Sequence, residues 1–282
     1  MILLYKKGDF HLHTTASDGN LFPSKLVCMA KQEGVDIISI TDHDTLSGID
    51  EALKEGKKIG IKVIPGIELS TLYESKSIHI LGYFKDISHI SPKFKNFLKE
   101  MNLYRINRAK KIVNNLYKFF NIKLNFESIV KTANGIVARP HIAKAIINAG
   151  YDYSFDYIFS NFIGDSSPAY VPNKKLSTIE GIKMLTSLNA MVVLAHPILI
   201  KDVNIEDLLK LPFHGIEAIY PVNRACDTEK FIKYAKKYNK IITAGSDFHS
   251  MDKKSLKHAH TIGEVYLDEN KITDFLNKLK NL

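Results

Sequence analysis

The chain has 282 residues, of which 45% are hydrophobic and 24% are charged, and these ordinary globular values exclude a disordered or fibrous protein. The formal net charge is +9, and only four of the 39 basic residues are arginines. A basic surface favours polyanionic partners such as nucleic acids, although a lysine-rich composition can equally be a general bias of the source organism.

The first ten residues, MILLYKKGDF, contain a four-residue apolar run before two lysines, which is too short for the core of a signal peptide. No window approaches the length of a membrane span. We therefore expect a cytoplasmic protein without membrane association, and no feature indicates an obligate protein partner. Cys28 and Cys226 lie far apart without a C-x-x-C spacing, which indicates neither a disulfide nor a thiolate metal site.

The first part of the chain alternates strand and helix patterns. Its apolar runs are rich in isoleucine and valine, as strands that are buried on both faces should be. Pro23 near the start of the first helical segment and Gly34 past its end are the expected punctuation. In chain order, we predict a strand at 7–13, a helix at 22–34, a strand at 35–42, a helix at about 48–59, and strands at 61–70 and 77–84.

The alternation resumes after residue 175. It predicts a helix at about 178–188, a strand at 191–196, a short helix, a strand at 215–220, a helix at about 226–238 and a strand at 241–247. Alternating elements predict a parallel sheet, and seven or eight such units close most naturally into a TIM-like barrel, here a distorted one. The alternative is an open doubly wound sheet, but no G-x-G-x-x-G loop follows the first strand.

Residues 86–175 separate the fourth and fifth predicted strands, a connection far longer than usual. Helical periodicity over 92–120 and further helical patterns downstream indicate that this segment has structure of its own. We therefore predict a small helical insertion, or cap, at 86–175. The barrel would then be discontinuous, formed by residues 1–85 and 176–282.

Histidines and acidic residues gather at the ends of the predicted strands. They are His11, His13, His43, His79, His196 and His249, accompanied by Asp18, Asp42, Asp44, Glu68 and Asp247. The C-terminal ends of the strands of a parallel barrel share one face, so we expect one rim to collect them. His11 and His13 form an H-x-H pair that points two imidazoles to the same side of a strand. One histidine alone would more often be structural, but six at strand ends favour a metal site.

Imidazole and carboxylate ligands without thiolates suit manganese, zinc or iron, with magnesium as a further candidate. Nine candidate ligands exceed the needs of one ion, so we expect two or three clustered divalent ions. Such clusters make hydroxide available near neutral pH and neutralise phosphate oxygens, which predicts hydrolysis, most readily at phosphorus.

Six motifs resemble those of the polymerase and histidinol phosphatase (PHP) family of metal-dependent phosphoesterases. In the family's order, they are DFHLHTTASDG, SITDHDTLSG, IPGIELS, IHILGY, AHP and AGSDFH. The resemblance covers residues 8–84 and 190–250, and it implies a distorted (β/α)7 barrel.

The resemblance also implies how the ligands are grouped. One ion would be held by His11, His13, Glu68 and Asp247, a second by His79, His196 and a bridging Glu68, and a third by Asp18, His43 and His249. A metal-activated hydroxide at this trinuclear site would attack phosphorus, and the third ion would bind a phosphate oxygen or the leaving group. Some family members carry histidine at the position of Asp18.

Asp42 and Asp44 flank His43, and each has two interpretations. A carboxylate at this place can orient a ligand imidazole, or it can cap the helix that follows. We predict orientation for Asp42 and capping for Asp44.

The segment ARPHIAKA places Arg139 and His141 at a predicted helix start, where free N–H groups attract phosphate. Arginine adds a bidentate fork that lysine cannot copy. Its scarcity in this chain, and the recurrence of R-P-H in the nucleotide-active branch of the PHP family, favour phosphate binding by both residues over a surface role. Arg224 is a weaker candidate, and Arg105 and Arg108 are expected on the surface of the long basic helix.

The resemblance to this branch implies a phosphoesterase that acts on nucleotides or short 5′-phosphorylated RNAs, similar to nucleoside 3′,5′-bisphosphate phosphatases and 5′-to-3′ exoribonucleases. A histidinol-phosphate-type phosphatase with a small cationic substrate is an alternative that the large basic insertion disfavours. A catalytically silent PHP module with a structural or interaction role is a third hypothesis, which the intact ligand set disfavours.

Overall fold

The computed structural model describes residues 5–88, 90–133, 136–172, 176–250 and 260–282, and within them seven strands form one sheet in chain order. The strands are β1 (Gly8–Leu12), β2 (Ile37–Ile40), β3 (Lys62–Tyr73), β4 (Lys76–Tyr83), β5 (Met191–Leu194), β6 (Gly215–Ile219) and β7 (Ile241–Ala244). Leu12 forms a parallel bridge to Phe248, just after β7, so the sheet nearly closes into a barrel. The predicted seven-stranded α/β barrel is confirmed.

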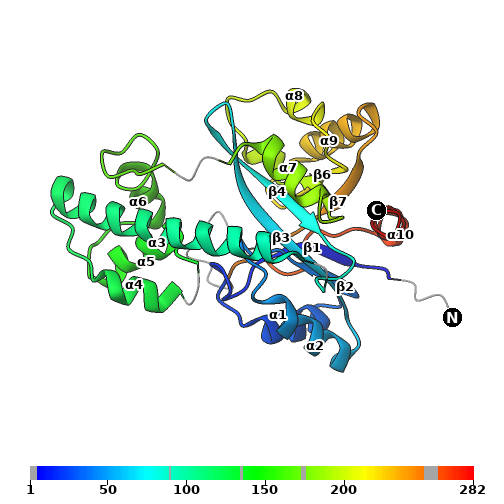
Figure 1. Ribbon diagram of the computed structural model, residues 1–282, viewed down its shortest axis with the longest axis horizontal. Helices are drawn as coiled ribbons and strands as arrows, with labels where there is room; N and C mark the ends of the chain where they lie inside the picture. Colours follow the sequence, from blue (N-terminus) through cyan, green and yellow to red (C-terminus); the bar gives the residue numbers. More distant parts are fainter. Residues whose placement is uncertain (1–4, 89, 134–135, 173–175, 251–259) are drawn as a thin grey trace.

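Helices lie around the outside of the sheet (Figure 1). They are α1 (Pro23–Gln32), α2 (Ile49–Ile59), α7 (Thr178–Thr186), α8 (Ile205–Leu209), α9 (Ala225–Lys237) and α10 (Glu269–Lys280), with a 3-10 turn, η1, at Pro197–Leu199. Residues with a known preference for helix termini mark where several of these helices begin or end. Pro23 begins α1, Gly60 ends α2 with a φ of 71°, and Ser177 and Glu180 form a capping box at the start of α7.

The fourth strand runs opposite to the predicted direction. β4 pairs antiparallel with both β3 and β5, so the prediction of a wholly parallel sheet is wrong at this strand. The reason is the two-residue turn of Glu74 and Ser75, whose φ angles of 48° and 67° are those of a tight hairpin. A parallel crossover needs a dozen residues or more. His79 therefore reaches the site from within β4 rather than from the C-terminal end of a parallel strand.

One end of the barrel is closed by apolar side chains. The ring of Phe275 in α10 lies with its centroid 4.2 Å from that of Phe10 in β1 and 5.0 Å from that of Tyr83 in β4. Gly8, the first residue of β1, pairs with Leu267 just before α10. Since α10 covers the end where β1 begins, the opposite end is left for polar side chains.

The chain between β4 and α7 forms helices with a core of their own. They are α3 (Pro92–Phe120), α4 (Phe126–Ala133), α5 (Arg139–Asn148) and α6 (Phe155–Asn161). Ile112 of α3 and Ile142 of α5 belong to this core, whereas Phe94 and Leu98 of α3 belong to a core of the barrel. The long helix α3 thus connects the two regions, and α4, α5 and α6 lie to one side of the sheet (Figure 1). Among the described residues, none of the helices has the length and hydrophobicity of a membrane span.

Candidate metal centre and substrate cavity

Nine imidazole and carboxylate side chains converge at the polar end of the barrel, and we call them the ligand cluster. They are His11 in β1, His13 and Asp18 after β1, His43 after β2, Glu68 in β3, His79 in β4, His196 after β5, and Asp247 and His249 after β7. The structure therefore brings together all nine residues that the sequence predicted as metal ligands.

Glu68 lies at the centre of the ligand cluster and is buried. Its Oε1 is 2.8 Å from Nδ1 of His79 and 2.9 Å from Nε2 of His196. Its Oε2 is 3.2 Å from Nε2 of His13 and 2.9 Å from Nδ1 of His43. Because its two oxygens face different imidazoles, Glu68 has the position that a bridging ligand requires.

His11, His13 and Asp247 form one side of the ligand cluster together with Glu68. The Nε2 atoms of the two histidines are 3.1 Å apart, and Oδ1 of Asp247 lies 3.4 Å from the first and 3.1 Å from the second. Asp247 has a φ of 52°, which is uncommon for a residue with a side chain. At Gly245, an added Cβ would lie 2.2 Å from the Cβ of His11, so only glycine lets the chain after β7 pass this close to β1.

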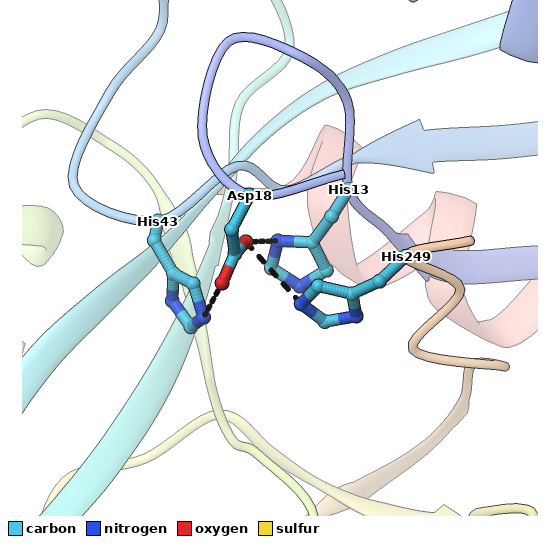
Figure 2. A group of neighbouring side chains, drawn as sticks. All are labelled: His13, Asp18, His43 and His249. Carbon is cyan, nitrogen blue, oxygen red and sulfur yellow. Dashed lines mark ion pairs between the residues drawn. The ribbon is translucent and has the colours of Figure 1, made fainter. Parts of the chain in front are cut away.

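Asp18 forms the other side of the ligand cluster, among three imidazoles (Figure 2). Its Oδ1 lies 3.3 Å from Nε2 of His249 and 3.7 Å from Nδ1 of His13, and its Oδ2 lies 3.9 Å from Nε2 of His43. The loop that carries Asp18 turns back tightly, since a Cβ at Gly19 would lie 2.4 Å from the backbone oxygen of His13. The loop thus brings a third group of donors together.

The ligand cluster fits divalent cations on two grounds, of which the first is unsatisfied polar atoms. Nδ1 of His196 is buried and makes no hydrogen bond within the described part of the chain, and the buried atoms Oδ1 of Asp18, Oε2 of Glu68 and Nδ1 of His43 face only other atoms of the ligand cluster. Atoms of this kind are costly in a protein interior unless a ligand satisfies them. Carboxylate oxygens and imidazole nitrogens are also donors that manganese, zinc and iron accept.

The second ground is electrostatic, because the buried carboxylates require positive charge. Burial would raise the pKa of Glu68, but the imidazoles of His43, His79 and His11 hold it well below its usual range. Burial would likewise lower the pKa of His13, but Asp247 and Glu68 outweigh burial and raise it to about 10. The proton on His13 thus acts as a counter-charge, a role that a metal ion takes when it displaces that proton.

Glu217 of β6 is a functional residue that the sequence analysis missed. It is fully buried, its Oε1 lies 3.0 Å from Nδ1 of His11, and its Oε2 accepts the backbone N–H of His196 at 2.8 Å. His196 has a φ of 24°, a strained backbone conformation that this hydrogen bond helps to hold. The available signal was an acidic residue in the middle of the otherwise apolar strand GIEAI.

We expect Glu217→Gln to preserve the fold but to weaken metal binding by about 10- to 100-fold, because a carboxylate behind a ligand imidazole fixes its orientation and raises its basicity. Competition with a chelator, followed by elemental analysis, measures the metal affinity. Glu229→Gln, an exposed position on α9, is the matched control. An unchanged affinity in Glu217→Gln would contradict the orienting role.

The prediction that Asp42 orients a ligand imidazole is wrong for a direct contact, because among the described residues its carboxylate bonds to no imidazole. Its carboxylate accepts the backbone N–H and the hydroxyl of Thr14, both at 2.7 Å, and the hydroxyl of Ser17 at 2.5 Å. Ser17 Oγ in turn lies 3.5 Å from Nδ1 of His13. Asp42 therefore holds the loop that carries Asp18, and its effect on the ligand cluster is transmitted through that loop.

Asp44 does not cap a helix, so that prediction is wrong. It accepts the backbone N–H of Ser70 at 2.8 Å and forms an ion pair with Arg105 of α3, while α2 begins without a side-chain cap. Arg105 also donates from Nη2 to the hydroxyl of Ser70 at 2.8 Å. Because Asp44 follows His43 directly and Ser70 lies two residues after Glu68, this buried ion pair connects α3 to the ligand cluster.

A cavity of about 860 Å³ extends from the ligand cluster to α5 and α6. Arg105, Arg108 and Arg139 line it, so three of the four arginines of the chain face the same space. Lys144 lines the cavity as well. Apart from the ligand cluster, the described lining residues include one carboxylate, that of Asp156, so positive charge exceeds negative charge in this part of the cavity. The cavity is therefore suited to an anionic ligand.

Arg105 and Arg108 are 7% and 6% exposed, so the prediction of surface positions is wrong for both. Nε of Arg108 donates to the backbone oxygen of Val171 at 2.6 Å, and its guanidinium lies over the ring of Tyr170. Within the described residues, Arg108 has no ion pair with a carboxylate. Burial lowers its pKa to about 10, and the nearby charge of Arg139 adds to this lowering, so Arg108 stays cationic at neutral pH.

Arg139 and His141 both lie at the start of α5, but only Arg139 lines the large cavity. Nη1 of Arg139 donates to Asp165 at 2.8 Å, and the Asp165 side chain is 72% exposed, which makes this ion pair weak. Nδ1 of His141 accepts the backbone N–H of Ala138 at 3.1 Å, and His141 lines a separate pocket of about 220 Å³. Burial lowers the pKa of His141, which favours its neutral form.

Arg224 lies apart from the cavity. It is exposed and forms an ion pair with Asp227 at the start of α9. The contacts of Arg224 therefore give it no part in the site, whereas the other three arginines of the chain line the cavity.

Clustered divalent ions and guanidinium groups share one chemical use, since both stabilise the negative oxygens of phosphate. The barrel, the donors and the arginines together define the class: the protein is a metal-dependent phosphoric ester hydrolase. The family model described as PHP domain matches residues 9–171, and the chain belongs to this family.

Similar proteins extend this likeness over most of the chain. A 5′-3′ exoribonuclease of Haemophilus influenzae is 31% identical over 250 residues, covering 86% of this chain and 90% of that protein. A 3′,5′-nucleoside bisphosphate phosphatase of Chromobacterium violaceum is 25% identical over 262 residues, covering 90% of each. A solved structure from Bifidobacterium adolescentis, described as a metal-dependent phosphoesterase, is 25% identical with a TM-score of 0.83 over 96% of each chain.

Proposed function

We propose that the protein hydrolyses phosphoester bonds of nucleotides or of short 5′-phosphorylated RNAs. The observation that carries this proposal is one cavity that joins the ligand cluster to three arginines. A substrate with a second phosphate beside the bond to be cleaved needs both features. The proposal is supported by the similarity of the chain to two proteins that are described as a 5′-3′ exoribonuclease and a 3′,5′-nucleoside bisphosphate phosphatase.

We propose that the ligand cluster holds two or three divalent ions of manganese, zinc or iron, with magnesium as an alternative. The donors form three groups: His11, His13, Glu68 and Asp247; His79, His196 and Glu68; and Asp18, His43 and His249, with His13 close to the last. When bound, such ions supply a hydroxide near neutral pH and neutralise phosphate oxygens. The protein holds the donors in place through Glu217 and through the contacts of Asp42.

We propose that Arg139 binds a substrate phosphate that is not cleaved, and we add Arg108 to this role. An anion near Arg108 would offset the repulsion between its buried charge and that of Arg139. Arg139 is available because its partner Asp165 is exposed. His141 supports the phosphate site by capping α5 from Nδ1.

We also propose that residues 86–175 act as a cap on the barrel of residues 1–85 and 176–282. The separate core of α3 to α6 supports this division, and so does the cavity, which has the ligand cluster on one side and α5 and α6 on the other. The ion pair between Arg105 and Asp44 would fix the position of the cap relative to the ligand cluster.

An activity assay with added manganese tests the proposal. The substrates are adenosine 3′,5′-bisphosphate, a 5′-phosphorylated RNA oligomer, histidinol phosphate and a DNA oligomer. We expect release of phosphate or nucleotide from the first two. Failure on both would overturn the proposed function, and activity on histidinol phosphate alone would favour the small-molecule phosphatase.

Arg139→Ala is expected to raise the KM for 5′-phosphorylated substrates by about 10- to 100-fold, the scale of a lost charge-assisted hydrogen bond. Bis(p-nitrophenyl) phosphate has no second phosphate, so its hydrolysis is expected to change by less than about twofold. Arg224→Ala is the control, because it removes an exposed arginine outside the cavity. Steady-state kinetics on both substrates decide the matter, and a wild-type KM in Arg139→Ala would exclude the phosphate-binding role.

A further inference from the structure

The wall that α6 contributes to the cavity is aromatic. Tyr153 lies just before α6, Phe155 and Phe159 belong to it, and all three line the same cavity as Arg108 and Arg139. The function proposed above accounts for the arginines and for the ligand cluster. It leaves these three rings without a role.

The rings are held in place by their neighbours. Tyr153 is stacked on Tyr157, with centroids 5.2 Å apart and an angle of 6° between the planes, and both stand edge-on against Phe162. Phe155 and Phe159 form a second pair with centroids 4.9 Å apart. A ligand that binds to prepositioned rings costs little side-chain entropy. The rings of the two pairs therefore offer a preformed aromatic surface.

This surface is open to solvent. Of the rings that line the cavity, Tyr153 is 39% exposed and Phe155 and Phe159 are partly buried, while Tyr157 supports Tyr153 from outside the cavity lining. Single exposed apolar side chains are ordinary, but exposed aromatic rings grouped inside a cavity mark a ligand surface. Their natural partner is another flat ring, because aromatic rings prefer stacked or edge-to-face contacts.

The aromatic surface adjoins the cationic one. The guanidinium of Arg139 lies 5.9 Å from the ring centroid of Phe159 and 5.7 Å from that of Tyr170. A ligand that fills both surfaces must be anionic at one end and flat and aromatic at the other. A nucleotide has this chemistry, whereas a sugar phosphate offers only the anionic end.

We propose that Tyr153 and Phe155 stack on a nucleobase of the substrate while Arg108 and Arg139 hold a phosphate. This inference rests on the proposed function and adds to it a binding site for the base of the substrate. Every base has a flat π-face, so stacking of this kind discriminates little between bases. We therefore expect adenine, guanine, cytosine and uracil substrates to be accepted alike.

Kinetics on substrates with and without a base test the inference. The double variant Tyr153→Leu/Phe155→Leu keeps apolar volume but removes the flat faces. Its KM for adenosine 3′,5′-bisphosphate is expected to rise about 5- to 100-fold, the range for losing one base–aromatic stack. For the base-free analogue 1-deoxyribose 3,5-bisphosphate, we expect a change of less than about twofold. Tyr153→Phe/Phe155→Tyr should restore the wild-type KM, and Phe119→Leu, an exposed ring on α3 outside the cavity, is the control.

A binding measurement separates this inference from the proposed function. Calorimetry on the whole protein compares adenosine 5′-monophosphate with ribose 5-phosphate in the absence of turnover. We expect the wild type to bind the nucleotide about 5- to 100-fold more tightly and the double variant to lose this preference. Equal binding of the two probes by the wild type would overturn the stacking surface. A preference for the nucleotide without hydrolysis of any nucleotide would leave stacking in place and overturn the proposed reaction.

Discussion

Glu68→Gln is expected to lower phosphoester hydrolysis by about 10²- to 10³-fold or more, because it removes the central negative charge of the ligand cluster. Both oxygens of Glu68 face imidazoles, and among the described residues no other carboxylate lies as close to the imidazole rings of His43, His79 and His196. The substitution keeps the size of the side chain, so the fold should persist. Elemental analysis of the purified variant should find less metal per chain than in the wild type.

The control for this variant is Glu229→Gln, which changes the same chemical group on the exposed face of α9. Its metal content and activity should equal those of the wild type. If Glu68→Gln binds metal normally and retains full activity, the bridging role of Glu68 is wrong. Full metal content with lost activity would instead place Glu68 in the reaction rather than in metal retention.

Arg105→Met is expected to reduce the free energy of unfolding by about 3–5 kcal/mol, because it leaves the buried carboxylate of Asp44 without its counter-charge. Asp44 is fully buried, and its remaining hydrogen bond to the Ser70 N–H does not neutralise it. Chemical denaturation measures the loss. The activity should fall as well, since Asp44 follows His43 and Ser70 lies close to Glu68 in β3.

The double variant Arg105→Met/Asp44→Asn should recover part of the lost stability, because asparagine can still accept the Ser70 N–H and carries no charge. Arg224→Met removes an exposed arginine that is also paired with an aspartate, and its free energy of unfolding should stay close to that of the wild type. Wild-type stability in Arg105→Met would show that the ion pair does not tie α3 to the barrel.

Most of the barrel was predictable because strands buried on both faces carry a local signal. The apolar runs at 35–42 and 191–196 contain β2 and β5, and Pro23 begins α1 as predicted. The direction of β4 is also encoded locally, because the two-residue turn of Glu74 and Ser75 is too short for a parallel crossover. α10 was not predicted, although Ile272, Phe275 and Leu279 recur at helical spacing.

The sequence by itself determined the chemistry of the site, because the side chains of the ligand cluster lie in short motifs and the resemblance assigned each of them. Only the tertiary structure decided which groups support those ligands. Glu217 contacts His11 across 206 residues of chain, and Arg105 contacts Asp44 across 61, and no local pattern encodes such pairs. The strand order places β6 beside the ligand cluster, and α3 places Arg105 and Arg108 in the lining of the cavity. Periodicity and residue type act over a few residues, whereas the partner of a buried charge depends on how distant segments pack.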